Sequence, residues 1–147
     1  MKLLLILTLS LMLQISNETQ IHFKNKGTLS VKLEGIQTEK GGKIYIALFN
    51  QKGNYMSENR YKGLIVDVND EDSFADISFI DLPEGDYAVT AFHDTNGNGE
   101  MDFDSNGMPL EAWATSGKSN PYGPPTWETS KIELKGSDVD IKLNFKK

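Results

Sequence analysis

Short segments in which apolar and polar residues alternate dominate this chain of 147 residues. Leu29, Val31 and Leu33 are separated by polar neighbours, and the segment from Val139 to Phe145 repeats the pattern. A period of two is typical of antiparallel strands with one buried face. Lys43–Phe49 is apolar on both faces, which favours a central strand. No long segment has the 3.6-residue period of an amphipathic helix, so the pattern predicts an all-β fold.

Turn-forming residues separate the predicted strands, notably at Gly41-Gly42, Pro83–Asp86 and Gly136–Asp138. About seven strands are expected, the others being Leu64–Val68, Phe74–Ile80, Tyr87–His93 and Ser130–Leu134. This number of short strands predicts an antiparallel β-sandwich of immunoglobulin or transthyretin type, with a closed barrel as the alternative. Only Asn54–Tyr61 could form a short helical turn.

The N-terminus has the features of a secretory signal peptide. Lys2 gives a positive start, and Leu3–Ile15 is almost continuously apolar but short for a membrane span. We expect a signal peptide at residues 1–19, cleaved near Ser16–Gln20, and one domain at residues 20–147. An uncleaved anchor is the alternative. Cleavage would leave a secreted, periplasmic or cell-envelope protein with no membrane insertion.

Composition narrows the classes of function. The formal net charge of −6 argues against nucleic acid and anionic membranes as partners. The absence of cysteine excludes disulfides, thiol catalysis and thiolate metal sites. With only two histidines, a histidine-rich transition-metal site is also not expected.

One segment departs from the strand pattern. Residues Asp94–Thr126 form a long stretch rich in Gly, Asn, Asp and Pro, without a strand or helix pattern. Loops of this length in compact domains are usually functional or disordered. The segment also contains several large apolar residues, among them Phe103, Trp113 and Tyr122, which is unlike a disordered tail. We therefore expect an ordered loop, and its aromatic residues either cap the core or bind a ligand.

The start of this loop resembles a calcium-binding loop. Oxygen-bearing side chains occur at alternate positions, as calcium loops require: Asp94, Asn96, Asn98, Glu100 and Asp102. Gly99 falls where such loops turn sharply, but Ser105 occupies the position of the usual bidentate Glu. The remaining ligands would have to come from Asp104, Glu111 or water. Affinity would lie at about 10⁻⁴ to 10⁻³ M, and magnesium fits less well.

A loop shaped only by hydrogen bonds is the alternative to the calcium site. Asn-Gly and Asp-x-Asn sequences form turns without a metal, through side-chain to backbone hydrogen bonds. His93, at the end of the predicted strand, could bind a metal or transfer protons, but a role in pinning the loop is favoured.

The segments GDYAVTAFHDTNGNGEMDFDSNGMPLEAW and SNPYGPPTWETSKIEL resemble the bacterial family catalogued as domain of unknown function 2141. Matching residues run through both segments and include His93, Asp94, Asn96, Asn98, Gly99, Asp102, Gly107, Pro109, Glu111, Ser119-Asn120 and Pro124-Pro125; upstream, Gly42–Asn50 also matches. Where members of this family usually have a Gly-Tyr-Gly type of segment, this chain has Ala112-Trp113-Ala114. The resemblance implies export and a β-sandwich, and it implies no activity.

Three functions remain open. The first is an exported, non-catalytic binding or accessory domain with a calcium loop, acting on an unknown envelope protein or glycan. The second is a cell-envelope hydrolase that uses His93 and the loop carboxylates. The third is a purely structural domain that assembles through edge strands. No Gly-x-Ser-x-Gly, Walker or HExxH motif is present, so the sequence favours the first.

Overall fold

The computed structural model describes residues 25–69, 73–118 and 123–146. The predicted signal peptide and its cleavage region lie outside these ranges. Within them, no helix has both the length and the apolar character that crossing a membrane requires.

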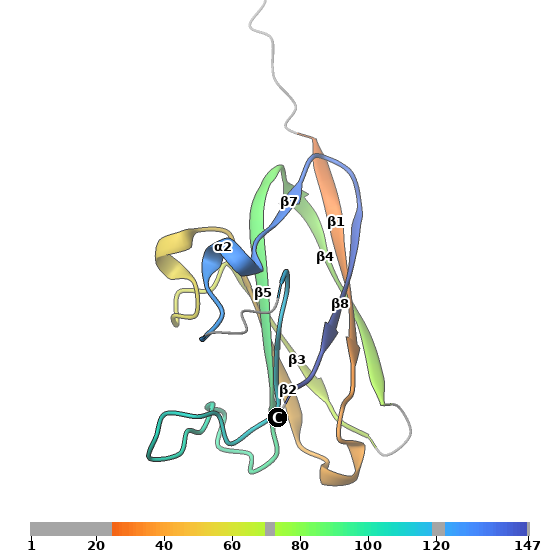
Figure 1. The fold of residues 1–147 in the computed structure, drawn as a ribbon. Helices are drawn as coiled ribbons and strands as arrows, with labels where there is room; N and C mark the ends of the chain where they lie inside the picture. Colours follow the sequence, from red (N-terminus) through yellow and green to blue (C-terminus); the bar gives the residue numbers. More distant parts are fainter. Residues whose placement is uncertain (1–24, 70–72, 119–122, 147) are drawn as a thin grey trace, which may run out of the picture.

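The first sheet contains three strands, in the order β4-β1-β8 (Figure 1). Strand β1 (Lys26–Glu34) pairs antiparallel with β4 (Phe74–Pro83). It pairs parallel with β8 (Val139–Asn144), with Leu29 opposite Val139 and Leu33 opposite Leu143. The prediction of a wholly antiparallel fold is therefore wrong at this pair, because alternation marks a strand but does not specify its partner or direction.

The second sheet has the order β3-β2-β5-β6. Strand β2 (Lys43–Phe49) lies between β3 (Lys62–Asp67) and β5 (Gly85–Asp94), antiparallel to both. Strand β6 (Trp113–Thr115) pairs with β5 at residues 90–92, and β7 (Ile132–Leu134) pairs with β5 at residues 85–87. Strand β6 lies within the stretch that was predicted to lack strands, and its three residues are too few to show alternation.

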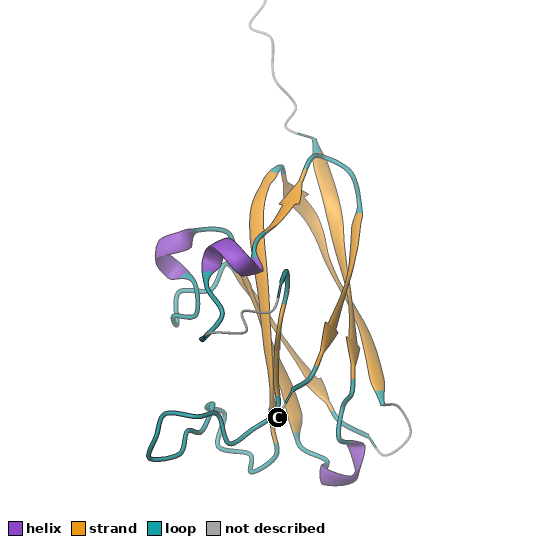
Figure 2. Cartoon of the chain, viewed as in Figure 1, coloured by secondary structure: helices purple, strands orange, loops and turns teal. Residues whose placement is uncertain are grey.

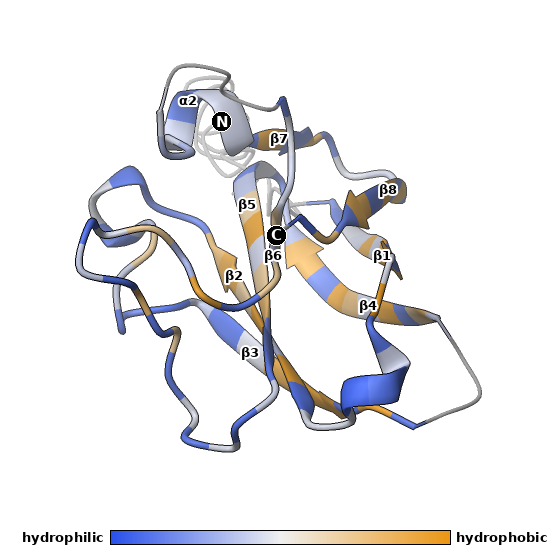
Figure 3. Cartoon of the chain, turned by 60° about the horizontal axis from the view of Figure 1, so that its bottom comes forward, coloured by the Kyte–Doolittle hydropathy of each residue, from blue (hydrophilic) through white to orange (hydrophobic). Residues whose placement is uncertain are grey.

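Both sheets contribute to one hydrophobic cluster. Its fully buried members include Leu29 and Leu33 of β1, Ile44 and Leu48 of β2, and Leu143 of β8. Figure 3 shows hydrophobic and hydrophilic residues alternating along β4, as expected for a strand with one buried face. The all-β prediction is confirmed. The sheets are open, and the described residues contain eight strands, against about seven expected.

The other face of the second sheet carries two of the three short helices of the described residues, and the third lies at the end of the sheets, between β1 and β2 (Figure 2). Helix α2 (Trp127–Ser130) begins at Thr126, whose side chain forms a capping box with Thr129. Trp127 packs with Phe49 and Ala88 in a small second cluster. Two 3₁₀ turns complete the structure, η1 (Thr38–Lys40) and η2 (Lys52–Asn54). The helical turn expected at residues 54–61 does not form, because η2 ends at Asn54 and residues 55–61 contain turns and bends. The strand expected from Ser130 begins at Ile132.

Candidate cation-binding loop

Strand β5 places its last two residues on opposite faces of the second sheet. Tyr87, Val89 and Ala91 belong to the cluster between the sheets, so alternation puts His93 on that inner face. Phe92 and Asp94 therefore share the outer face. The loop that follows β5 projects from the same side of the sheet as α2, away from β1, β4 and β8 (Figure 1).

Asp94 is the anchor of the loop. Its side chain is fully buried, and each carboxylate oxygen accepts a backbone N–H. Gly97 N donates to Oδ1 at 2.7 Å, and Gly99 N donates to Oδ2 at 2.9 Å. Both glycines have φ near +78°, at +77° and +79°, a region that other residues enter only at a cost. The Asp-x-x-Gly-x-Gly spacing therefore folds the loop around one carboxylate.

Asp102 closes the same loop from its far end. Asn96 Nδ2 donates to Asp102 Oδ2 at 2.6 Å, and Asn98 Nδ2 lies 3.0 and 3.1 Å from the two Asp102 oxygens. The side-chain oxygens of Asn96 and Asn98 accept the backbone N–H groups of residues 98 and 100. These are the local turn bonds that the hydrogen-bonded alternative predicts. Asn96, Asn98 and Asp102 thus form one side-chain network, and Asp94 holds the backbone of the same loop.

Glu111 lies beside this network and is 6% exposed. Phe92 is opposite Trp113 in the β5–β6 pair, and His93 N donates to Ala112 O, so the register brings Asp94 opposite Glu111. Glu111 Oε1 accepts the Thr95 N–H at 3.1 Å, whereas Oε2 is buried and has no hydrogen-bond partner within the part of the chain that the structure describes. The register therefore places two buried carboxyl groups at opposite positions, one at the end of β5 and one just before β6. Like charges in this position repel, and an unpaired buried charge is costly.

Asp104 belongs to a separate small hairpin. Phe103 forms a bridge with Pro109, and Asp104 Oδ1 accepts the N–H groups of Asn106 and Met108 at 2.8 and 2.9 Å. The Met108 N–H, and then the Asn106 N–H, hold the pKa of Asp104 below its usual value of 3.8. The Asp104 carboxylate therefore stabilises its own turn and is not joined to the Asp102 network.

His93 is 1% exposed, and its Nε2 lies 2.6 Å from the main-chain oxygen of Gly41. Its ring makes an edge contact with Phe145, and Nδ1 is buried without a partner. His93 therefore fixes the neighbouring Gly41-Gly42 turn from the inner face. It does not point toward Asp94, since the two residues are on opposite faces.

The structure thus joins three of the predicted ligand residues by side-chain hydrogen bonds, Asn96, Asn98 and Asp102. Asp94 and Glu111 bond to the backbone of the same loop, at Gly97, Gly99 and Thr95. Glu100 is exposed and contributes its backbone N–H, and Asp104 is turned away. In residues 25–69, 73–118 and 123–146, no three His, Cys, Asp or Glu side chains gather as a metal-binding group. Any cation at this loop would need amide, carbonyl or water oxygens as well. The sequence analysis did not predict that Asp94 accepts hydrogen bonds from the backbone of Gly97 and Gly99, although two glycines so close to an aspartate indicate such a turn.

An apolar row crosses the outer face next to this network. Ile65, Tyr45, Phe92 and Trp113 are opposite one another on β3, β2, β5 and β6. Ile65 is 59% exposed, the other three are half-buried, and the Tyr45 and Phe92 rings stack at 5.1 Å. A Cβ atom on Gly99 would lie 3.5 Å from the Tyr45 hydroxyl, so the loop reaches back to this row.

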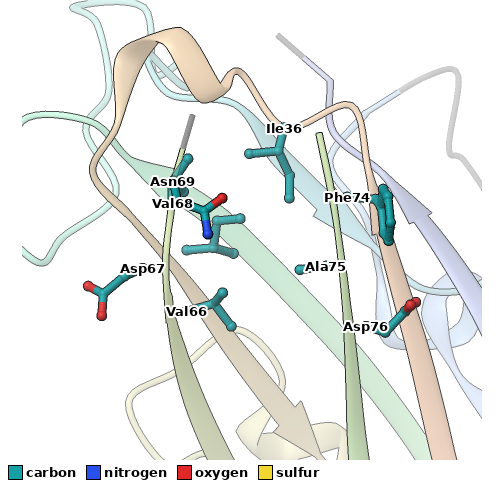
Figure 4. A pocket seen from close by; sticks show the side chains of 9 residues that line it. Ile36, Val66, Asp67, Val68, Asn69, Phe74, Ala75 and Asp76 are labelled. Carbon is teal, nitrogen blue, oxygen red and sulfur yellow. The ribbon is translucent and has the colours of Figure 1, made fainter. Parts of the chain in front are cut away.

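A pocket of about 260 Å³ opens elsewhere, between the edges of β3 and β4 (Figure 4). Its lining is mostly apolar, with Val66, Val68 and Ala75 among its residues, and its titratable side chains are Asp67 and Asp76. It contains no histidine or hydroxyl nucleophile.

The fold and the site define an all-β protein of two open sheets with an Asp/Asn/Gly loop at the end of one central strand. The chain belongs to the family described as "Uncharacterized protein conserved in bacteria (DUF2141)", which it matches over residues 31–142. No curated protein and no solved structure matches it. The resemblance noted from the sequence motifs is confirmed.

Proposed function

We propose that this protein is an exported, non-catalytic binding or accessory domain of the cell envelope, built as an immunoglobulin- or transthyretin-like sandwich, whose loop at Asp94–Asp102 binds calcium. The observation that carries the proposal is the buried Glu111 carboxyl group opposite Asp94. One Glu111 oxygen has no hydrogen-bond partner among the described residues. A divalent cation beside the two carboxylates would remove both the repulsion and the unpaired charge.

The ligand set follows from the geometry. Asp94, Asp102 and Glu111 would supply the charge, and Asn96, Asn98 and the backbone carbonyls of the loop would supply further oxygens. On binding, the amide nitrogens of Asn96 and Asn98 would have to turn away from Asp102. A half-turn of the side-chain amide would do this, because it places the oxygen where the nitrogen was. Because several ligands are neutral, affinity in the extracellular range of about 10⁻⁴ to 10⁻³ M is expected.

A partner would dock on the apolar row of Ile65, Tyr45, Phe92 and Trp113. Half-exposed aromatic residues in contiguous positions are a common feature of surfaces that bind glycans or proteins. The hydrolase alternative has less support, because His93 is on the inner face and bonded to Gly41. A general acid or base must reach its substrate within hydrogen-bond distance.

The test is thermal unfolding of the wild type in EDTA, calcium and magnesium. Calcium at ten times Kd should stabilise the protein by about 1.4 kcal/mol, or about 5 °C in Tm. Asp94→Asn should abolish the shift. Asp81→Asn is the control, because the side chain of Asp81 is 71% exposed and belongs to β4 in the other sheet. An unchanged wild-type Tm in millimolar calcium would refute the calcium site.

A further inference from the structure

The loop contains three Asn-Gly pairs, at residues 96–97, 98–99 and 106–107. All six residues are exposed. Asn-Gly is the dipeptide most open to self-deamidation, because glycine has no side chain to hinder its own backbone nitrogen. The three pairs therefore differ in reactivity only as far as the folded loop restrains them.

The reaction needs no enzyme and no oxidant. The glycine nitrogen attacks the side-chain carbonyl carbon of the preceding Asn, a C–N bond forms, and a succinimide ring closes. The bond from this carbon to the amide nitrogen breaks, and ammonia leaves with the proton of the glycine nitrogen. Water then opens the ring at either carbonyl, giving aspartate or isoaspartate.

The structure opposes this reaction at two of the pairs. The attacking nitrogens would be those of Gly97 and Gly99, and both donate their proton to the Asp94 carboxylate. Hydrogen bonds to a charged group are stronger than neutral ones. Loss of the proton would also place a developing negative charge beside a buried carboxylate. Asp94 therefore holds both nucleophiles in their unreactive form.

The electrophilic side chains are held as well. The amide nitrogens of Asn96 and Asn98 donate to Asp102, and their oxygens accept backbone N–H groups. Each amide must break these bonds before it can rotate toward its own glycine. At the third pair, Gly107 N donates to the main-chain oxygen of Asp104 at 3.0 Å, and the Asp104 carboxylate also interacts with the Gly107 N–H and the Asn106 side chain. The difference lies in burial, because Asp104 is partly exposed to solvent and Asp94 is fully buried.

We propose that the Asp94 carboxylate slows self-deamidation of Asn96 and Asn98 in the folded protein, and that Asn106 is the site that reacts there. Each conversion adds one negative charge, so the loop becomes more acidic as the protein ages. This inference does not depend on bound calcium, since the bonds from Gly97 and Gly99 exist within the chain itself.

The test is peptide mapping by mass spectrometry after incubation of the full chain at mildly alkaline pH in EDTA. Asn106 in the folded wild type should deamidate at least about tenfold faster than Asn96 and Asn98, the effect of one charged hydrogen bond. In the chain unfolded by urea, the three rates should converge. Equal rates at the three sites in the folded protein would overturn the proposal.

Variants of the two aspartates provide matched controls. Asp94→Ala should accelerate Asn96 and Asn98 by about ten- to a hundredfold and leave Asn106 within about twofold. Asp104→Ala should accelerate only Asn106. If circular dichroism shows that Asp94→Ala is unfolded, Asp94→Asn keeps one acceptor oxygen and should accelerate at least one of the two sites. Folded Asp94 variants with wild-type rates at both sites would refute the role of Asp94.

Discussion

The substitution Glu111→Gln tests two effects of the buried Glu111 carboxylate separately: how much it destabilises the protein without a cation, and how much it contributes to cation binding. The glutamine keeps an oxygen for the Thr95 N–H, a bond of 3.1 Å in the wild type. It replaces Oε2, which has no hydrogen-bond partner among the described residues, by an amide nitrogen that can donate a hydrogen bond. The change therefore removes a charge without removing the side chain.

The sign of the effect should depend on calcium. In EDTA, relief of an unsatisfied buried charge should stabilise the variant by about 1 to 2 kcal/mol, or about 4 to 8 °C in Tm. Calcium at ten to a hundred times Kd should stabilise the wild type by about 1.4 to 2.7 kcal/mol. The variant lacks one of the two buried charges and should gain little. Calcium should therefore abolish or reverse the order of the two Tm values.

The assay is thermal unfolding by circular dichroism, supported by urea unfolding with a shared slope m for both proteins. Glu133→Gln is the matched control, because Glu133 is an exposed residue paired with Lys135 at 3.0 Å. It should change stability by less than about 0.5 kcal/mol in either buffer. A Glu111→Gln protein that is less stable than wild type in EDTA, or that responds equally to calcium, would refute this reasoning.

Three further predictions concern the supports of the loop and the outer face. The folded protein lowers the pKa of Asp104, so this carboxylate stabilises its hairpin fully above pH 3.8 and loses that effect as the pH falls through its folded-state pKa. In an NMR titration, the amide chemical shifts of Asn106 and Met108 should therefore change below pH 3.8. Gly42→Ala should cost about 3 kcal/mol or more in urea unfolding, because Gly42 has φ of +84° and its Cβ would collide with the Asp94 main-chain oxygen. Gly53→Ala, with no atom near its Cβ, should cost under about 1 kcal/mol. Trp127→Ala should cost about 3 to 5 kcal/mol, since Trp127 is 8% exposed and packs on Phe49; a loss under 1 kcal/mol would contradict its place in that cluster.

The strands were predictable wherever burial imposes a period. Strand β2 spans Lys43–Phe49, the range expected from a segment that is apolar on both faces. Helix α2 was missed, although Thr126 and Thr129 have the spacing of a capping box. Strand β6 could not be predicted, because three residues show no periodicity and its position depends on pairing with distant β5.

The candidate site was predictable in part for the same reason. Asp94, Asn96, Asn98 and Asp102 are close in sequence, so their spacing alone predicts that they meet. Glu111 could be placed in the site only as a possible extra ligand, since its position opposite Asp94 follows from the β5–β6 register. The orientation of His93 could not be predicted, because it depends on which face of β5 packs against the core.

The parallel pairing of β1 with β8 has a mechanical consequence. The N-terminal end of β1 and the C-terminal end of β8 lie at opposite ends of six paired residues, from Leu29–Val139 to Glu34–Asn144. A force that pulls Lys26 and Asn144 apart would act along the strands and strain all their cross-strand hydrogen bonds together, in shear. An antiparallel pair pulled from one end would open one bond at a time. The arrangement suits a domain that must withstand tension between its two ends.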